Sequence, residues 1–313
     1  MNANPLATAG ASASARFKLM RPPQWTKNAL LFAGFIFSGR LRQPTEVLVR
    51  EFVAVVIAFA AFCLLSSATY LINDVKDLEL DRAHPEKRLR PLASGQVPIA
   101  TAWAMSCALL VSALALALVV VALMQTPWFL ASAVAYLALT MAYSVWLKHL
   151  VIVDVMALAL GFVIRVVAGC LAIAVSISSW LLLCTFNLAL FMALCKRRQE
   201  LVAFGDAAAP VRRVLADYST QLLDVLIAVS ASATYMSYCL YTVQAPHRDF
   251  MGGESPWLLL TVLPVFVGLG RFLYLVYQRA AGGKPEDLLR DRVIAAAVLG
   301  WIALVVTLSK IGA

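Results

Sequence analysis

Amide and carboxylate side chains recur at a helical spacing between residues 73 and 81. Asn73, Asp77 and Asp81 are four residues apart, so on a helix they lie along one stripe, with Asp74 beside them. Carboxylates at this spacing repel each other, which indicates that a cation sits between them. Oxygen ligands without a His or Cys partner suit Mg²⁺, which prefers one or two carboxylates together with substrate phosphate oxygens. The spacing therefore predicts a Mg²⁺ cofactor at this stripe.

Cationic side chains follow the acidic stripe directly. Lys87, Arg88 and Arg90 offer N–H donors that suit phosphate oxygens. A diphosphate bridged by Mg²⁺ is the ligand that acidic and basic groups in this order would bind. The alternative is a solvated surface loop whose acidic and basic side chains pair with each other.

The composition places this segment in a membrane protein. Hydrophobic residues make up 62% of the 313 residues and charged residues 14%, and the mean hydropathy is +0.83. Soluble domains are about 45–50% apolar and about 25% charged, so soluble, secreted, fibrous and disordered classes are excluded. The net charge of +9 is typical of Lys and Arg gathered in cytoplasmic loops, and no nucleic-acid partner is expected.

Apolar stretches long enough to cross about 30 Å of hydrocarbon as helices follow a predicted disordered tail at 1–15. The sequence predicts nine such spans, which make 16–313 a single transmembrane domain with catalytic loops at 73–98 and 196–218. The predicted spans are 23–40, 50–72, 99–123, 127–147, 150–174, 178–196, 219–244, 256–278 and 291–310.

The distribution of Lys and Arg predicts how these spans are oriented. With the N-terminus in the cytoplasm, 19 of the 26 Lys and Arg residues lie on the cytoplasmic side and five on the other. Because cytoplasmic loops carry the excess of Lys and Arg, we expect the N-terminus and the acidic stripe on the cytoplasmic face.

The segment that carries the stripe resembles the first aspartate-rich motif of the UbiA superfamily of intramembrane prenyltransferases. The resemblance implies an all-α integral membrane fold of nine transmembrane helices, in a bundle around a lipid-open cavity, and it covers the chain beyond the tail. The matching residues are Asn73-Asp74-xx-Asp77-xxx-Asp81 and His84-Pro85-x-Lys87-xx-Arg90-Pro91-xx-Ser94-Gly95.

The chain departs from the quinone-type members after the sixth predicted span. Where those members carry a second acidic motif, this sequence reads Lys196-Arg197-Arg198-Gln199-Glu200. Three cations in place of aspartates favour direct contact with a phosphate group over a second metal ion.

Further segments resemble the branch of the superfamily that transfers phosphoribosyl to decaprenyl phosphate. In that branch the polyprenyl phosphate is the nucleophile, and phosphoribosyl diphosphate supplies the electrophilic C1 and the diphosphate leaving group. The matching residues are Arg21-Pro22-xx-Trp25-x-Lys27-Asn28, Tyr143-Ser144-xx-Leu147-Lys148, Asp154, Gly161-Phe162-xx-Arg165-xxx-Gly169 and Pro285-Glu286-Asp287-xx-Arg290-Asp291-Arg292.

The resemblance also implies partners and a location. The partners are phosphoribosyl diphosphate, a polyprenyl phosphate (decaprenyl or undecaprenyl) and membrane lipid, and the product is a precursor of lipid-linked arabinofuranose. The location is the inner, cytoplasmic membrane of a bacterium. A homo-oligomer, specifically a trimer, is implied in the same way.

Site roles follow from the resemblance. The predicted metal ligands are Asn73, Asp77 and Asp81, and the predicted catalytic residues are Asp77, Asp81, Lys87 and Arg90. Arg165, a charge within a predicted span, is costly in lipid and is expected either to face a polar cavity or to snorkel to the interface. The predicted substrate-binding residues are Lys27, Asn28, Asp74, Arg88, Tyr143, Lys148, Arg165, Lys196, Arg197, Arg198 and Glu200.

Two other functions compete with this hypothesis. One is prenyl transfer from a prenyl diphosphate to an aromatic or isoprenoid acceptor, against which the basic run at 196–198 counts. The other is membrane transport, but transporters place ionisable residues near the midplane, whereas most charges here crowd one face.

Overall fold

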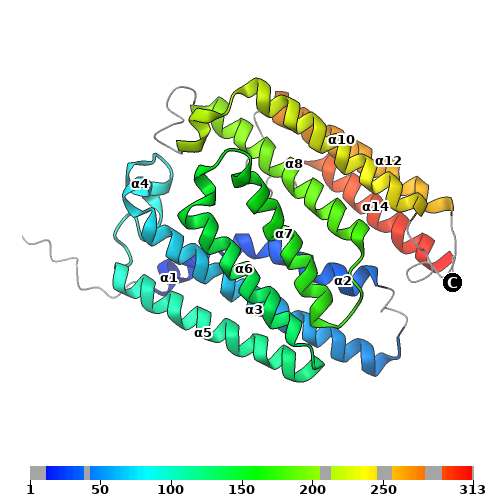
Figure 1. Cartoon of the computed structure of the whole chain (residues 1–313), viewed down its shortest axis with the longest axis horizontal. Helices are drawn as coiled ribbons and strands as arrows, with labels where there is room; N and C mark the ends of the chain where they lie inside the picture. The colour runs from blue at the N-terminus through cyan, green and yellow to red at the C-terminus, as the bar shows by residue number, and fades with distance from the viewer. Residues whose placement is uncertain (1–11, 39–42, 205–212, 245–255, 279–290, 312–313) are drawn as a thin grey trace, which may run out of the picture.

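The computed structural model describes residues 12–38, 43–204, 213–244, 256–278 and 291–311, and within these ranges the chain forms helices and short connections without any β-strand (Figure 1). The long helices are α3 (Thr45–Lys76), α5 (Ile99–Met124), α6 (Pro127–Val145), α7 (Val153–Ala172), α8 (Ser179–Phe204), α10 (Thr220–Gln244), α12 (Val262–Gln278) and α14 (Arg292–Ile311). The short elements are α1 (Ala13–Leu19), η2 (Pro22–Leu31), α2 (Phe32–Phe37), α4 (Leu78–Ala83), η4 (Lys87–Leu89), η5 (Leu147–His149), η7 (Arg213–Asp217) and η8 (Pro256–Thr261).

Seven described helical segments are long and apolar enough to cross a membrane. They correspond to the predicted spans 2 to 8, and α14 covers the ninth with a shorter apolar stretch, Arg292–Leu308. The first predicted span, 23–40, is instead the 3-10 helix η2 followed by the short helix α2. The all-helical membrane class is therefore supported, and the count of nine spans stays a prediction.

Helix α7 lies at the centre of the packing. It packs against α6 on one side and α8 on the other, while α3 runs along α5 and α12 along α14 (Figure 1). One apolar cluster fills the space between α3, α5, α6 and α7, and a second joins α7, α8, α10, α12 and α14. Because α7 contributes to both clusters, it is the wall that the two halves of the bundle share.

Helix η2 packs so closely on α7 that the two backbones are in contact. A Cβ atom added at Gly169 would lie 1.9 Å from the carbonyl oxygen of Leu31. One turn further, a Cβ at Gly34 would lie 2.8 Å from Sγ of Cys170. Only glycine permits this contact, so these two positions fix where η2 and α2 lie on α7.

The charged connections gather at one end of the bundle. The elements α1, α4, η5 and η7 lie at the left end in Figure 1, whereas the last turns of α14 lie at the right end. Helix α1 begins at Ala13, inside the range predicted as a disordered tail; residues 1–11 lie outside the described ranges.

Candidate active site

The acidic stripe lies where α3 leaves the apolar part of the bundle. At about 1.5 Å per residue, the 32 residues of α3 exceed the hydrocarbon thickness of about 30 Å. Asn73 and Asp74 therefore stand on the last turn of α3, and Asp77 follows at its end. The amide of Asp77 donates to the carbonyl of Asn73 at 2.9 Å, and that of Asp81 to the carbonyl of Asp77 at 2.8 Å. The helical repeat thus continues into α4.

The predicted alignment is confirmed for one pair of side chains. Nδ2 of Asn73 donates to Oδ2 of Asp77 at 3.0 Å, as residues four apart on one face should. Asp81 instead turns its carboxylate toward the loop that follows α4, where it meets Arg90.

Cations of the chain itself lie between the carboxylates. Nη1 of Arg90 is 2.5 Å from Oδ2 of Asp81 and 3.2 Å from Oδ1 of Asp74. Asp74 is also paired with Arg21, and Nζ of Lys87 is 4.0 Å from Oδ1 of Asp81. The loop is therefore paired with itself, as the alternative interpretation of its sequence expects.

Burial explains why these ion pairs are needed. The side chains of Asp74 and Asp81 are only 3% and 5% exposed. A buried carboxylate without a partner is costly, so each requires a cation or several N–H donors. Arg90 provides these donors for both carboxylates at once.

Lys148 is brought to the stripe from another part of the chain. It lies in η5, between α6 and α7, and its Nζ is 2.7 Å from Oδ1 of Asp77. Both side chains are partly exposed. The fold thus joins two predicted site residues that are 71 positions apart.

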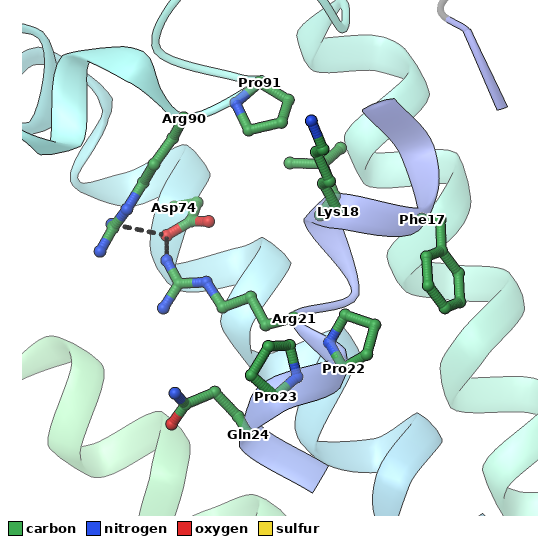
Figure 2. Close-up of a pocket in the computed structure, with 10 residues that line it drawn as sticks. Phe17, Lys18, Arg21, Pro22, Pro23, Gln24, Asp74, Arg90 and Pro91 are labelled. Carbon is green, nitrogen blue, oxygen red and sulfur yellow. Dashed lines mark hydrogen bonds and ion pairs between the residues drawn. The ribbon is translucent and has the colours of Figure 1, made fainter. Parts of the chain in front are cut away.

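A cavity of about 640 Å³ opens beside Asp74 (Figure 2). Arg21 and Arg90 approach the Asp74 carboxylate from two directions, and Lys18 stands on the α1 side next to Pro91. The cavity is lined by Phe17, Lys18, Leu19, Arg21, Pro22, Pro23, Gln24, Asp74, Arg90 and Pro91.

The turn that carries Arg21 is held in an unusual conformation. Arg21 has φ 52° and ψ 57°, the left-handed region, and Pro22 follows it. This region is costly for a residue with a Cβ. Ser67 on α3 holds the turn, because its hydroxyl donates to the carbonyl of Met20 at 2.7 Å and accepts from Trp25 Nε1 at 3.0 Å. These contacts aim the Arg21 side chain into the cavity.

Sequence reasoning did not select Arg21 or Lys18 as site residues. Arg21 stands at the start of a matched segment, so its signal was present in the sequence. Lys18 lies three residues earlier, near the end of α1, whereas Arg21 follows that helix in a left-handed turn. The neighbouring α1 carries Lys18 into the cavity lining.

The three cations at 196–198 do not form one phosphate-binding patch. Consecutive helical residues point in different directions, and on α8 they meet different partners. Lys196 is half-exposed with its ammonium 4.0 Å from Glu200, and Nε of Arg198 is 2.5 Å from Oδ1 of Asp224. Arg197 is fully buried. The structure therefore gives the three cations different partners, and their predicted contact with a phosphate stays a prediction.

Arg197 is the centre of a buried ionic network. Its Nε is 2.7 Å from Oδ2 of Asp154, its Nη1 is 2.8 Å from Glu200, and its Nη2 is 3.4 Å from the hydroxyl of Tyr143. The Asp154 and Arg197 side chains are 0% and 1% exposed. Arg197 thus contacts Asp154, Glu200 and Tyr143, and its pair with Asp154 holds α7 and α8 together.

Tyr218 extends this network to the segment that carries Lys148. Its hydroxyl donates to Oδ1 of Asp154 at 2.8 Å and accepts from the amide of Ile152 at 2.7 Å. Burial and the neighbouring Asp154 raise the pKa of Tyr218 above its usual value, so the hydroxyl keeps its proton. Ile152 has φ 68°, and this anchor stabilises the strained turn between η5 and α7. An isolated Tyr gives no sequence signal for such a role.

Arg165 lies in the interior and away from the acidic stripe. Its Nε donates to Oδ1 of Asn28 at 2.8 Å, its Nη1 to the carbonyl of Gly161 at 2.8 Å, and its Nη2 to the hydroxyl of Tyr136 at 2.7 Å. In the described residues no carboxylate pairs with it. Arg165 and Asn28 thus join η2, α6 and α7, and their predicted role in substrate binding stays a prediction.

The remaining predicted residues lie at the edge of the site. Arg88 is exposed, and the described ranges contain no ion pair to it. Lys27 is half-buried on η2. Part of the predicted loop at 196–218 and of the matched segment at 285–292 lies outside the described residues.

The donor chemistry at the stripe fits Mg²⁺, although the carboxylates do not converge on one point. Within the described residues, no three His, Cys, Asp or Glu side chains lie close enough to hold a metal ion together. Asp74 and Asp81 do approach each other closely enough to share Nη1 of Arg90. Two carboxylates completed by phosphate oxygens are a normal environment for Mg²⁺. The residues fit a metal that is bound together with a phosphate ligand.

Comparison with known proteins gives consistent similarities. The model of the UbiA prenyltransferase family matches residues 30–286. A decaprenyl-phosphate phosphoribosyltransferase of Mycobacterium tuberculosis is 36% identical over 292 residues, which cover 92% of each chain. Its counterpart in Corynebacterium glutamicum is 32% identical over 295 residues, 94% of this chain and 86% of that protein. A UbiA homolog from Archaeoglobus fulgidus, solved bound to GPP and Mg²⁺, has TM-score 0.66 and 18% identity, over 95% of this chain and 99% of its own.

Proposed function

Because the chain belongs to the UbiA prenyltransferase family, we propose that it transfers the 5-phosphoribosyl group from phosphoribosyl diphosphate to a polyprenyl phosphate. The products are diphosphate and polyprenylphosphoryl-5-phosphoribose, the precursor of lipid-linked arabinofuranose. The observation that carries the proposal is the 32% and 36% identity, over nearly the whole chain, to phosphoribosyltransferases that act on decaprenyl phosphate. The protein is an integral membrane protein, and we place its site at the cytoplasmic face of a bacterial inner membrane.

The geometry supports a substrate that carries several negative charges. Four cationic side chains, Arg21, Lys87, Arg90 and Lys148, lie against three carboxylates at one end of the bundle. Such cations can change partner from carboxylate to phosphate without a large movement. Prenyl transfer to an aromatic acceptor is less well supported, because Arg197 stands where a second acidic motif would be required.

Asn73, Asp74, Asp77 and Asp81 are the residues that would hold Mg²⁺. When bound, the metal would neutralise the negative charge that develops on the diphosphate as the bond to C1 breaks. Lys87 and Arg90 would bind the same leaving group by N–H donors. Lys148 would move from Asp77 to a phosphate oxygen.

The attacking group requires little activation. A polyprenyl phosphate is anionic at neutral pH, so no general base is needed, and the chain's contribution is positioning and charge neutralisation. In-line attack on the α-configured donor inverts C1, and the product is expected to carry a β linkage. NMR of the purified lipid product checks this expectation, and an α linkage would contradict in-line displacement.

The decisive experiment is transfer of radiolabel from phosphoribosyl diphosphate into extractable lipid. Purified protein receives Mg²⁺ and decaprenyl or undecaprenyl phosphate, with EDTA and Asp77→Ala as the samples that should lose activity. Glu79→Ala is the matched control, because Glu79 is 82% exposed and pairs only with Arg82 among the described residues. Prenyl transfer to an aromatic acid, without phosphoribosyl transfer to either lipid, would replace the proposed substrates while retaining the family.

A further inference from the structure

The cavity beside α1 carries more positive than negative charge. Lys18, Arg21 and Arg90 line it together with a single carboxylate, that of Asp74. Asp74 already pairs with both guanidinium groups. In the part of the chain that the structure describes, Lys18 forms no ion pair. A net positive charge therefore remains in the cavity after its internal pairs are counted.

The two guanidinium groups keep donors for a ligand. An arginine side chain has five N–H groups in a planar fork that matches phosphate oxygens. The hydrogen bonds of the described residues use Nη2 of Arg21 and Nη1 of Arg90. The other N–H groups are left for water or for an anion that enters between the two side chains.

Arg21 is held in position before any ligand arrives. Its guanidinium carbon lies 5.2 Å from the ring centroid of Tyr70, and its strained backbone is anchored to α3 through Ser67. Backbone strain of this kind gathers at ligand-binding sites. A side chain that is already ordered loses less entropy on binding, which favours affinity.

The cavity is chemically distinct from the part of the stripe at Asp77. Asp77 does not line the cavity and is paired with Lys148. The cavity itself offers only one carboxylate, which is paired with two arginines, so a divalent cation would find too few ligands within the cavity. A phosphate group with two negative charges matches the surplus of cations and needs no metal ion.

We propose that this cavity binds a phosphate monoester, with Lys18 and Arg21 as its main ligands and Arg90 shared with the acidic stripe. Within the proposed function, on which this inference rests, two substrates offer that chemistry. One is the 5-phosphate end of the ribosyl donor, and the other is the phosphate of the polyprenyl acceptor.

Calorimetric titration without Mg²⁺ tests the site directly. Ribose 5-phosphate and polyprenyl phosphate are titrated separately into the full chain in lipid nanodiscs, for wild type, Lys18→Gln and Arg21→Gln. The matched control is Arg16→Gln, since Arg16 is an exposed cation of α1 that does not line the cavity. Because a charge-assisted contact is lost, Lys18→Gln and Arg21→Gln should each lower the affinity for one of the two esters by about tenfold or more. The affinity of Arg16→Gln for both esters should equal that of wild type. Unchanged melting temperatures establish that the variants are folded.

The possible results distinguish a failure of the proposed phosphate site from a failure of the proposed reaction. A weakened affinity for ribose 5-phosphate assigns the cavity to the donor, and a weakened affinity for polyprenyl phosphate assigns it to the acceptor. Equal affinity of wild type and both folded variants for both esters overturns the proposal, whether or not radiolabel transfer occurs. Variant-sensitive binding in a protein that transfers no phosphoribosyl group leaves the site in place and refutes the reaction.

Discussion

Among the single residues, Arg90 has the most demanding position. It lies against the nearly buried carboxylates of Asp74 and Asp81, and it also lines the cavity beside α1. Without Arg90, the two nearly buried carboxylates would have fewer cationic partners, and burying an unpaired negative charge costs free energy. The same guanidinium therefore stabilises the protein and supplies donors for phosphate.

Replacing Arg90 should affect both stability and activity. Arg90→Gln is expected to lower the free energy of unfolding by about 2 kcal/mol, because hydrogen bonds to charged groups are worth about 1.5–3 kcal/mol, and to reduce phosphoribosyl transfer at least tenfold. Thermal unfolding in detergent and the radiolabel assay measure the two effects. Arg82→Gln serves as the control, because Arg82 is half-exposed and pairs with Glu79, and equal losses in both variants would remove Arg90 from the site.

His84 gives the loop a pH dependence. Its Nδ1 accepts the amides of Glu86 and Lys87 at 3.1 and 3.3 Å, which forms the turn into η4. Burial, and then the charge of Lys87, lower the pKa of His84 below its ordinary value of about 6.5, while Asp81 acts in the opposite direction. The neutral ring is thus favoured by folding, and its contribution is present above about pH 6.5 and lost as pH falls through the folded pKa.

Thermal stability should therefore decline more steeply below about pH 6.5 in wild type than in His84→Asn. Asparagine keeps an acceptor near the two amides and does not titrate. Melting temperatures between about pH 5 and 7.5 measure the difference. His149→Asn, at an exposed position of η5, should follow wild type, and parallel curves for wild type and His84→Asn would contradict the assignment.

At the scale of elements, the contact between η2 and α7 positions the start of the chain at the site. Asn28 of η2 accepts a hydrogen bond from Arg165 of α7, and Gly169 lets the two backbones touch. Helix η2 begins directly after Arg21. A displacement of η2 would therefore move Arg21 away from Asp74.

Gly169→Ala should be strongly destabilising. Its Cβ would lie 1.9 Å from backbone oxygen of Leu31, which no side-chain rotation can relieve, and overpacking of a core typically costs about 1–3 kcal/mol. Gly270→Ala on α12 is the control, because a Cβ there meets nothing within 4 Å. Thermal unfolding of both variants measures the difference, and equal melting temperatures would show that η2 can move without cost.

Local pattern was sufficient to predict some elements and not others. The apolar stretches predicted nine spans, and seven of these correspond to described helices that are long and apolar enough to cross a membrane. The four-residue spacing predicted the contact of Asn73 with Asp77. The first predicted span, 23–40, is instead the 3-10 helix η2 followed by the short helix α2, because apolar composition alone does not distinguish a 3-10 helix from an α-helix. The residues that hold it, Arg165 and Gly169, act through tertiary contacts far along the chain.

For the site, too, the sequence predicted some residues, whereas tertiary contacts decide the environment of others. The motif match identified Asp77, Asp81, Arg90 and Lys148, which the fold brings together in ion pairs. The motif match did not distinguish a cation at the site from a cation that is buried in an ion pair elsewhere in the fold. Arg197 was therefore expected to bind phosphate, because its partner Asp154 is 43 positions away and sequence spacing does not reveal that pair.

At the scale of the whole molecule, the site is assembled from segments that belong to different parts of the bundle. The start of η2, the end of α3, the loop after α4 and the segment η5 each bring a charged side chain to it. A ligand that bridges these charges would hold the segments together. Substrate binding should therefore stabilise the fold as a whole.

Mg²⁺ and diphosphate are expected to stabilise the protein together more than separately. Mg²⁺ alone must compete with Arg90 and Lys148 for the carboxylates, whereas a diphosphate gives those cations new partners and supplies oxygen ligands to the metal. Melting temperatures with Mg²⁺, with pyrophosphate and with both measure this linkage. A shift for both that equals the sum of the single shifts, or one that persists in Asp77→Asn, would contradict it.

The buried pair of Arg197 and Asp154 also constrains how this chain can be related by descent to family members with a second acidic motif. The single change Arg197→Asp would leave a new carboxylate beside Asp154 and Glu200, in a place where their cation has gone. Such an intermediate sequence would fold poorly before it could gain a new activity. An evolutionary path between the two sequences must therefore change both ends of the pair, or pass through neutral residues at both positions.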